Sequence, residues 1–180
     1  ANSEAVAYNG TGQVDGEEVV KLSGCFGPML PMEDFDDAQR MKSHFEKLCG
    51  EGAEPGRYRG GDADFDVDEV EWEGEVLRAT FSVPQSEPFF ADHFPRNPVF
   101  PGTLLMTLCI NIGKRFVRSD AVPIGIYHAK IREFMPPGSL LEFMAEKVPE
   151  NDKGDQFVMV SLKVEDQFKP LVKVGFETPK

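Results

Sequence analysis

The sequence contains few cysteine and histidine residues, on which disulfides and most metal sites depend. Its 180 residues include three cysteines, three histidines and one tryptophan. The cysteines are scattered and form no Cys-x-x-Cys pair, so neither a disulfide framework nor a zinc ribbon is indicated. Free thiols fit a reducing compartment, and we expect a cytoplasmic protein. The histidines have no companion ligands at metal-binding spacings, and we expect no metal.

Positive charge is also scarce. Lysine and arginine number 19 against 31 aspartate and glutamate residues, which gives a formal net charge of −12. This balance argues against non-specific binding to nucleic acid. No apolar run reaches the roughly 20 residues that a membrane-spanning helix needs, and Ala1 begins no signal-peptide pattern. We therefore expect no nucleic-acid partner and no membrane span.

The most informative stretch is a proline-rich loop at residues 90–102. It contains one histidine and three prolines, at His93, Pro95, Pro98 and Pro101. A proline fixes its own φ angle and restricts the residue before it. His93 is therefore predicted to be held in one place.

The loop runs into an apolar segment, residues 103–112. Its apolar residues cover every side of a helix, which predicts a buried core helix. Thr103 is a candidate for its cap, and Gly102 permits a close backbone approach. The unpaired amides at the helix start would then point at whatever lies beside His93.

The loop and helix together resemble the signature of the 3-hydroxyacyl-thioester dehydratases of fatty-acid synthesis, which have the hotdog fold. The family motif is His-Phe-Pro-Gly-x-Pro-x-x-Pro-Gly. This sequence matches it at His93, Phe94, Pro95, Pro98, Pro101 and Gly102, with Arg96 where the family usually has glycine. In element order, the resemblance extends from about Asp64 to Thr178.

The resemblance implies elimination of water from a 3-hydroxyacyl thioester to give a trans-2-enoyl thioester. It implies an acyl chain carried on the phosphopantetheine of acyl carrier protein or coenzyme A, and no other cofactor. His93 would be the base, and the Gly102 amide would stabilise the oxyanion. The implied substrate-binding residues are Phe94, Phe100, Pro101 and Asn111.

One departure from the family concerns the acid. The family carries Glu or Asp on the central helix, fourteen positions after the histidine, and here that catalytic position is Thr107. Asn111 stands where the family often has Gln. No acidic residue occurs between Gly102 and Asp120, and a threonine hydroxyl is a hydrogen-bond partner but a very poor acid.

Two alternative functions stay open. One is a non-catalytic hotdog half, paired with an active half. The other is an acyl thioesterase, which would use the same helix start with a water nucleophile, although it too would want a carboxylate near the helix.

Carrier docking requires a local basic patch, because acyl carrier proteins are acidic and so is this chain. The candidate basic residues are Arg96, Lys114, Arg115, Arg118, Lys130 and Arg132. The family resemblance also implies a homodimer, or pairing with a second hotdog domain, with active sites at the interface.

The remaining pattern predicts an α+β protein with the hotdog fold, in which a curved antiparallel sheet wraps round a central buried helix. Residues 63–180 are expected to form this domain. Short segments bounded by turn residues predict its strands at 67–72, 76–83, 124–132, 140–148, 157–164 and 171–176. A single such sheet leaves edge strands unpaired, which dimerisation would resolve.

Residues 1–62 are expected to form an extension. Its first twelve residues show no periodicity, and disorder is expected at the start. Residues 13–24 predict a hairpin or strand end, and residues 34–49 an amphipathic helix. The segment 13–24 weakly resembles 163–175, the closing strands of the hotdog. Two hypotheses stand: the extension is the tail of a preceding hotdog, or a strand and a helix were added to one domain.

Overall fold

The computed structural model describes residues 5–52, 65–91, 93–117, 120–149, 151 and 154–177. The chain divides into two compact units, Ala1–Gly52 and Ala53–Lys180. We describe each unit separately. The expected domain boundary between residues 62 and 63 lies outside the described residues.

The first unit begins with a long hairpin. β1 (Ala5–Val14) and β2 (Glu17–Pro28) pair antiparallel. Asp15 and Gly16, between them, have positive φ angles of 51° and 84°, as in the two-residue turns that match the twist of paired strands. The predicted hairpin is confirmed, but its first strand begins at Ala5, where the sequence shows no periodicity, because β1 takes its strand conformation from pairing with β2. The disorder expected at the start of the chain concerns residues 1–4, which lie outside the described residues.

A helix follows the hairpin. A 3₁₀ turn at Met32–Asp34 leads to α1 (Ala38–Cys49). Asp37 caps α1 by accepting a hydrogen bond from the Arg40 backbone N–H at 2.9 Å, which satisfies one of the unpaired amides of the first turn. The predicted helix therefore exists but begins four residues later than residue 34.

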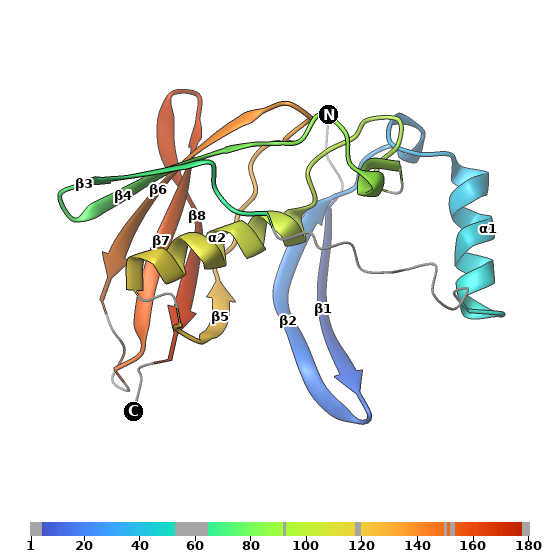
Figure 1. Cartoon of the computed structure of the whole chain (residues 1–180). Coiled ribbons are helices and arrows are strands. Elements are labelled where there is room, and N and C mark those ends of the chain that lie inside the picture. The colour runs from blue at the N-terminus through green and yellow to red at the C-terminus, as the bar shows by residue number, and fades with distance from the viewer. Residues whose placement is uncertain are drawn as a thin grey trace. The chain divides into compact units, whose positions relative to one another are not determined.

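The second unit is a six-stranded antiparallel sheet in the order β3-β4-β6-β7-β8-β5 (Figure 1). Its strands are β3 (Glu69–Glu73), β4 (Val76–Ser82), β5 (Pro123–Tyr127), β6 (Leu140–Val148), β7 (Gln156–Val164) and β8 (Gln167–Phe176). A 3₁₀ turn, η2 (Pro88–Ala91), and α2 (Gly102–Val117) lie between β4 and β5 in the sequence.

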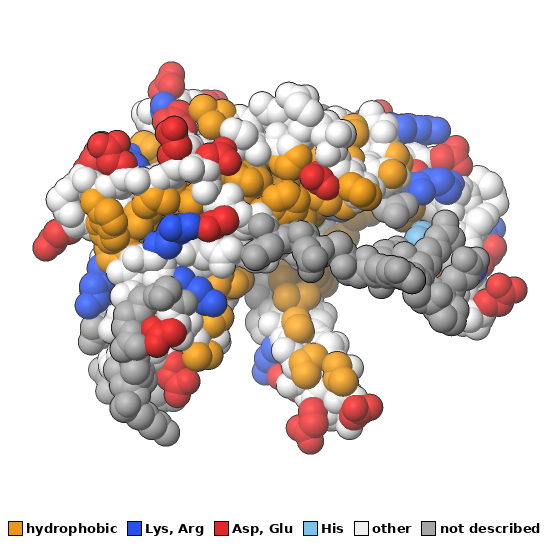
Figure 2. Space-filling view, viewed as in Figure 1, with side chains coloured by type: hydrophobic (Ala, Val, Ile, Leu, Met, Phe, Trp, Pro, Cys, Tyr) orange, Lys and Arg blue, Asp and Glu red, His pale blue; other side chains and the backbone are white. Residues whose placement is uncertain are grey.

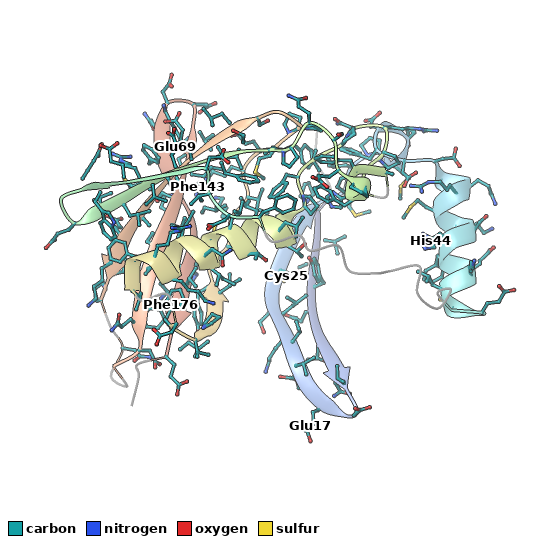
Figure 3. The ribbon with its side chains drawn as sticks, viewed as in Figure 1. Glu17, Cys25, His44, Glu69, Phe143 and Phe176 are labelled. Atoms are coloured by element: carbon teal, nitrogen blue, oxygen red, sulfur yellow. The ribbon has the colours of Figure 1, made fainter. Side chains whose placement is uncertain are left out.

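α2 lies across the sheet and packs against β6, β7 and β8 (Figure 1). Phe143 and Phe176 project from the sheet on the side that α2 covers (Figure 3). Gly113 lets the helix come close, because a Cβ atom there would lie 2.7 Å from the Phe176 ring. Burial raises the pKa of the Cys109 thiol on the same side of α2, so it stays protonated and acts as a small hydrophobe.

This arrangement is the predicted hotdog fold, a curved antiparallel sheet around a central helix. One correction concerns α2, which is covered on one side only. Thr103 and Thr107 are exposed, and three apolar residues are only half-buried: Leu104, Met106 and Ile110. An all-round apolar helix with one side uncovered indicates a surface that association would bury.

The two edges of the sheet differ in chemistry. β3 carries Glu69, Glu71 and Glu73, and charge on an edge strand opposes pairing with another chain. β5, at the opposite edge, has the uncharged sequence Pro-Ile-Gly-Ile-Tyr. Ile124 and Ile126 in it are 42% and 41% exposed. β5 is therefore the edge suited to continuing the sheet into a partner.

The strand predicted at residues 124–132 ends at Tyr127. His128 has a positive φ of 54°, which an extended strand does not accommodate. The chain then turns, and the Lys130 N–H donates to the Leu171 carbonyl at 2.7 Å. This bond fixes residues 130–132 beside β8.

Candidate functional site

The loop between η2 and α2 is held by backbone hydrogen bonds. The His93 N–H donates to the Phe89 carbonyl at 2.8 Å, and the Asn97 N–H donates to the Phe94 carbonyl at 2.9 Å. Phe94 itself has a positive φ of 59°, an unusual conformation for a residue with a large side chain. Together with the loop prolines, these bonds give His93 a defined position, as predicted.

The His93 ring is oriented by a backbone acceptor. Its Nδ1 lies 3.1 Å from the Val99 carbonyl oxygen. A carbonyl can only accept, so Nδ1 carries the proton in neutral histidine and Nε2 keeps its lone pair. The Phe94 ring packs against the imidazole, with 4.5 Å between ring centroids. The sequence singled out His93, but it gave no signal for Val99, whose contribution is a main-chain oxygen.

The start of α2 presents unpaired amides. The Pro101 carbonyl accepts the first helical bond, from the Leu105 N–H at 3.0 Å. Pro101 is thus at the N-cap and Gly102 is the first helical residue, so the expected capping role of Thr103 is wrong. The first amides of a helix have no acceptor within it and carry partial positive charge. A Cβ atom on Gly102 would come within 3.0 Å of Ile131 Cδ1, so glycine fits this crowded position.

Thr107 and Asn111 lie further along α2. Thr107 Oγ1 donates to the Thr103 carbonyl at 3.2 Å, and the side chain is exposed. Asn111 is half-buried, and its Nδ2 donates to the Phe65 carbonyl at 3.4 Å. The position at which the family carries its acid therefore lies on the side of α2 that the sheet leaves uncovered. The site roles of both residues stay predictions.

The aromatic candidates fall into two environments. Phe94 is 38% exposed beside His93, whereas Phe100 is 2% exposed. The Phe100 ring packs against three other rings, with centroid separations of 5.3–6.1 Å, from Phe65, Phe81 and Phe89. Phe100 is thus part of the domain core, and Pro101 beside it is buried at the helix start. Substrate binding by Phe94, Phe100 and Pro101 stays a prediction.

The candidate basic residues do not form one patch. Lys114 and Arg115 lie at the far end of α2 from His93, since a sixteen-residue helix is about 24 Å long. Arg115 is paired with Asp66. Arg118 lies outside the described residues. Arg96, in the loop, belongs to the His93 end.

Lys130 and Arg132 also lie at the His93 end of α2. They flank Ile131, whose Cδ1 would lie 3.0 Å from a Cβ atom on Gly102. Both are exposed, and Arg132 is positioned by hydrogen bonds to the Lys130 and Pro170 carbonyls. The sequence did not show that these two residues lie at the opposite end of α2 from Lys114, because their position depends on the turn after β5.

No group of three potential metal ligands occurs within the described ranges. His44 and His128 are both exposed. Among the residues that the structure describes, no helix is long and apolar enough to cross a membrane.

A protein-family model described as ApeI-like, ApeI dehydratase, matches residues 69–169. The chain belongs to the ApeI-like dehydratase family. The match runs from β3 to the first three residues of β8, and includes the His93 loop and all of α2. The family therefore agrees with the hotdog domain and with the dehydratase resemblance of the loop.

Curated relatives of this ApeI-like chain carry the name 3-hydroxyacyl-[acyl-carrier-protein] dehydratase FabZ. The protein from Protochlamydia amoebophila is 27% identical over 114 residues, which cover 60% of this chain and 73% of the relative. The protein from Pediococcus pentosaceus is 35% identical over 89 residues, which cover 46% and 59%. The chain thus spans little more than half of the second relative.

Two solved structures are similar to the ApeI-like chain at low identity. The dehydratase heterocomplex ApeI:P from Xenorhabdus doucetiae has a TM-score of 0.48 and 16% identity, covering 61% of this chain and 95% of that one. A thioesterase from Haemophilus influenzae has a TM-score of 0.41 and 16% identity, covering 60% and 73%. Similarity at this level is no argument for either activity.

Proposed function

We propose that this chain eliminates water from a 3-hydroxyacyl thioester to give a trans-2-enoyl thioester. The observation that carries the proposal is the bond between His93 Nδ1 and the Val99 carbonyl. It leaves Nε2 as the basic nitrogen, in the loop that leads into the amides of α2. Membership of a dehydratase family supports the same reaction.

The proposed chemistry begins at His93 Nε2, which takes the proton from the carbon next to the thioester carbonyl. The electron pair of that C–H bond moves toward the carbonyl, and the developing oxyanion accepts a hydrogen bond from the Gly102 N–H. The pair then returns to form the carbon–carbon double bond as the 3-hydroxyl leaves. The proton on Nε2 passes to the departing oxygen, so water is released and His93 is again neutral.

In this scheme one histidine serves as base and then as acid, because no residue of α2 is a carboxylate. Proton transfer needs no cofactor beyond the phosphopantetheine that carries the acyl chain, of acyl carrier protein or coenzyme A. The proposed catalytic residues are His93 and Gly102, with Thr107 at the position of the family acid. A cytoplasmic location remains a prediction.

Replacing His93 tests the proposal directly. His93→Ala is expected to lower the rate of interconversion of a 3-hydroxyacyl and trans-2-enoyl thioester by about 10²–10⁴-fold, the usual contribution of a general base. Loss of enoyl absorbance on hydration of crotonyl thioester would measure it. His44→Ala, at an exposed histidine on α1, is the matched control and should keep the parent rate. Equal rates in all three proteins would exclude His93 as the base.

Gly102 can be tested by a pair of substitutions that differ in one N–H. Gly102→Pro removes the donor at a helix position that tolerates proline, whereas Gly102→Ala keeps it. Both add a Cβ atom next to Ile131. We expect kcat of the proline variant to be about 10²–10³-fold below that of the alanine variant, as for other oxyanion donors. Similar kcat values in the two variants would assign the oxyanion to another group.

A second candidate function is a non-catalytic hotdog half. The observation that favours it is Thr107, whose hydroxyl bonds to the Thr103 carbonyl of its own helix. Absence of turnover in the parent protein would support this function and reject the one-histidine scheme. Measurement of free thiol in the same assay would reveal thioester hydrolysis.

The proposed carrier-docking surface consists of Arg96, Lys130 and Arg132, the basic residues at the His93 end of α2. Lys130→Glu is expected to raise KM for an acyl carrier protein substrate about fivefold, because reversing a charge weakens attraction to an acidic partner. KM for a short pantetheine thioester should not change. Lys114→Glu, at the other end of α2, is the control. Equal changes in KM from both substitutions would contradict this placement.

We also propose that the chain acts as a pair of hotdog domains, either two copies or one copy with a different hotdog. The uncovered apolar side of α2 and the uncharged β5 edge support this pairing. Thr107 lies on the uncovered side, so whatever covers α2 would face it. Measurement of mass in solution would establish whether two copies associate.

A further inference from the structure

The hairpin β1–β2 has two faces of different chemistry. Residues paired across an antiparallel sheet share a face, and one face of the hairpin combines the pairs Val6–Gly27, Tyr8–Cys25, Gly10–Leu22 and Gly12–Val20. We call this the apolar face. The opposite face carries the polar pairs Thr11–Lys21 and Gln13–Glu18 toward the turn, and the apolar pairs Ala5–Pro28 and Ala7–Phe26 toward the other end. In the half of the hairpin next to the turn, this alternation is typical of a sheet with one covered and one solvated side.

The apolar face is exposed. Its larger residues are between 45% and 52% accessible: Val6, Tyr8, Val20 and Leu22. Figure 2 shows hydrophobic side chains at the surface along the hairpin, with acidic side chains at its tip. Figure 3 marks Glu17 at the tip and Cys25 toward the other end. An isolated two-stranded hairpin is marginally stable in water, so a stable β1–β2 requires further strands or a helix.

The hairpin β7–β8 of the second unit is built like β1–β2, and it indicates which elements would cover the apolar face. Its turn residues, Glu165 and Asp166, have positive φ angles like Asp15 and Gly16. Aligning the two turns places the pair Gly10–Leu22 on the pair Val160–Val172.

One irregularity near the turn also corresponds. Val19 in β2 and Leu171 in β8 are each left without a partner on the first strand, whereas a second register shift of β1–β2, between Tyr8 and Gly10, has no counterpart in β7–β8. The two bulges lie two residues apart in the alignment. Bulges set the local bend of a strand and are built features of a sheet. The weak sequence repeat is therefore also a repeat of turn conformation and, as far as the pair Gly10–Leu22, of strand pairing.

In β7–β8 the face that corresponds to the apolar face lies against α2. Val158, Val160, Val172 and Val174 on it are at most 1% exposed. Both strands are interior, since β7 pairs with β6 as well as β8, and β8 pairs with β5 as well as β7. A hairpin of this construction thus belongs inside a hotdog sheet, with a central helix across it.

We propose that β1 and β2 are the last two strands of a second hotdog half in the same polypeptide, whose central helix covers the apolar face. In the observed domain the helix and the other strands precede the closing pair in the sequence. The same order would place the remaining elements of the second half N-terminal to β1. This inference rests on the fold and is independent of the proposed reaction.

Hydrogen exchange of backbone amides tests the inference. The 180-residue chain would be compared with the protein expressed from its whole natural reading frame. In the longer protein we expect N–H groups of β1 and of β2 that do not bond within the hairpin to exchange about 100-fold more slowly, because both strands become interior. A reading frame without hotdog elements before β1, or unchanged exchange, would overturn the inference. Turnover is no part of this readout.

The apolar face could instead be covered by a second copy of this chain, and hydrogen exchange would distinguish the two cases. A second copy would protect one edge of the hairpin in the 180-residue chain itself, to a degree that rises with protein concentration. That outcome would also overturn the inference.

Two matched substitutions in the longer protein test which face of the hairpin is buried. Val20→Asp places a charge on the apolar face and should abolish the added protection of β1 and β2. Thr11→Asp makes the same change from a β-branched residue on the opposite face, next to Lys21, and should leave protection intact. Amides of β7 and β8 serve as an internal reference for folding. Equal effects of the two substitutions would contradict the assignment of faces.

Discussion

Thr107→Glu is expected to increase the dehydration rate of this protein by about 10²-fold or more, the usual contribution of a general acid. In the mechanism proposed above, the proton that His93 Nε2 has taken must itself be transferred to the departing hydroxyl. A carboxylic acid at residue 107 would protonate that oxygen directly. The side chain is exposed on a regular helix turn, and glutamate is a good helix former, so the substitution should preserve the fold of the single chain. Initial rates with a 3-hydroxyacyl thioester would measure the gain.

Thr107→Gln is the control for shape, because glutamine matches glutamate in size and cannot act as an acid. The double variant His93→Ala with Thr107→Glu is the control for the base, and it should lose the gain. A rate increase in Thr107→Gln equal to that in Thr107→Glu would show that side-chain size, rather than proton donation, is responsible. An unchanged rate in Thr107→Glu would show that residue 107 does not reach the leaving group.

Phe100→Ala is expected to lower the free energy of unfolding by about 3–5 kcal/mol, the cost of removing a buried phenylalanine. The ring is 2% exposed and packs against Phe65, Phe81 and Phe89. The Phe100 N–H also bonds to the Met135 carbonyl at 2.8 Å, so this residue ties the loop to the segment that leads into β6. Urea denaturation followed by tryptophan fluorescence would measure the loss.

Phe134→Ala is the matched control, since Phe134 is 50% exposed and surface substitutions usually change stability by about 0.5 kcal/mol or less. A small stability loss in Phe100→Ala, accompanied by a large rise in KM for long acyl chains, would refute the core assignment. It would instead make Phe100 a wall of the acyl-binding site, as the family resemblance implies.

Local patterns identified most elements of the hotdog domain. β6 has the predicted bounds of residues 140–148, because its alternating residues and flanking turn signals are all local. β1 was missed, since glycine and polar residues interrupt it at Asn9, Gly10 and Gly12. Its conformation is set by pairing with β2, and cross-strand pairing is not written in the periodicity of one strand.

The sequence by itself determined the fold class, the position of His93 in a stiff loop, and the absence of a carboxylate on the central helix. These features depend on residue identity and on local backbone restriction, which act within a few positions of the chain. Tertiary structure decided which ring nitrogen of His93 is basic, through the Val99 carbonyl. It also placed Lys130 beside the start of α2, separated Lys114 from it, and left one side of α2 uncovered. These outcomes depend on contacts between segments far apart in the sequence, which composition and spacing do not specify.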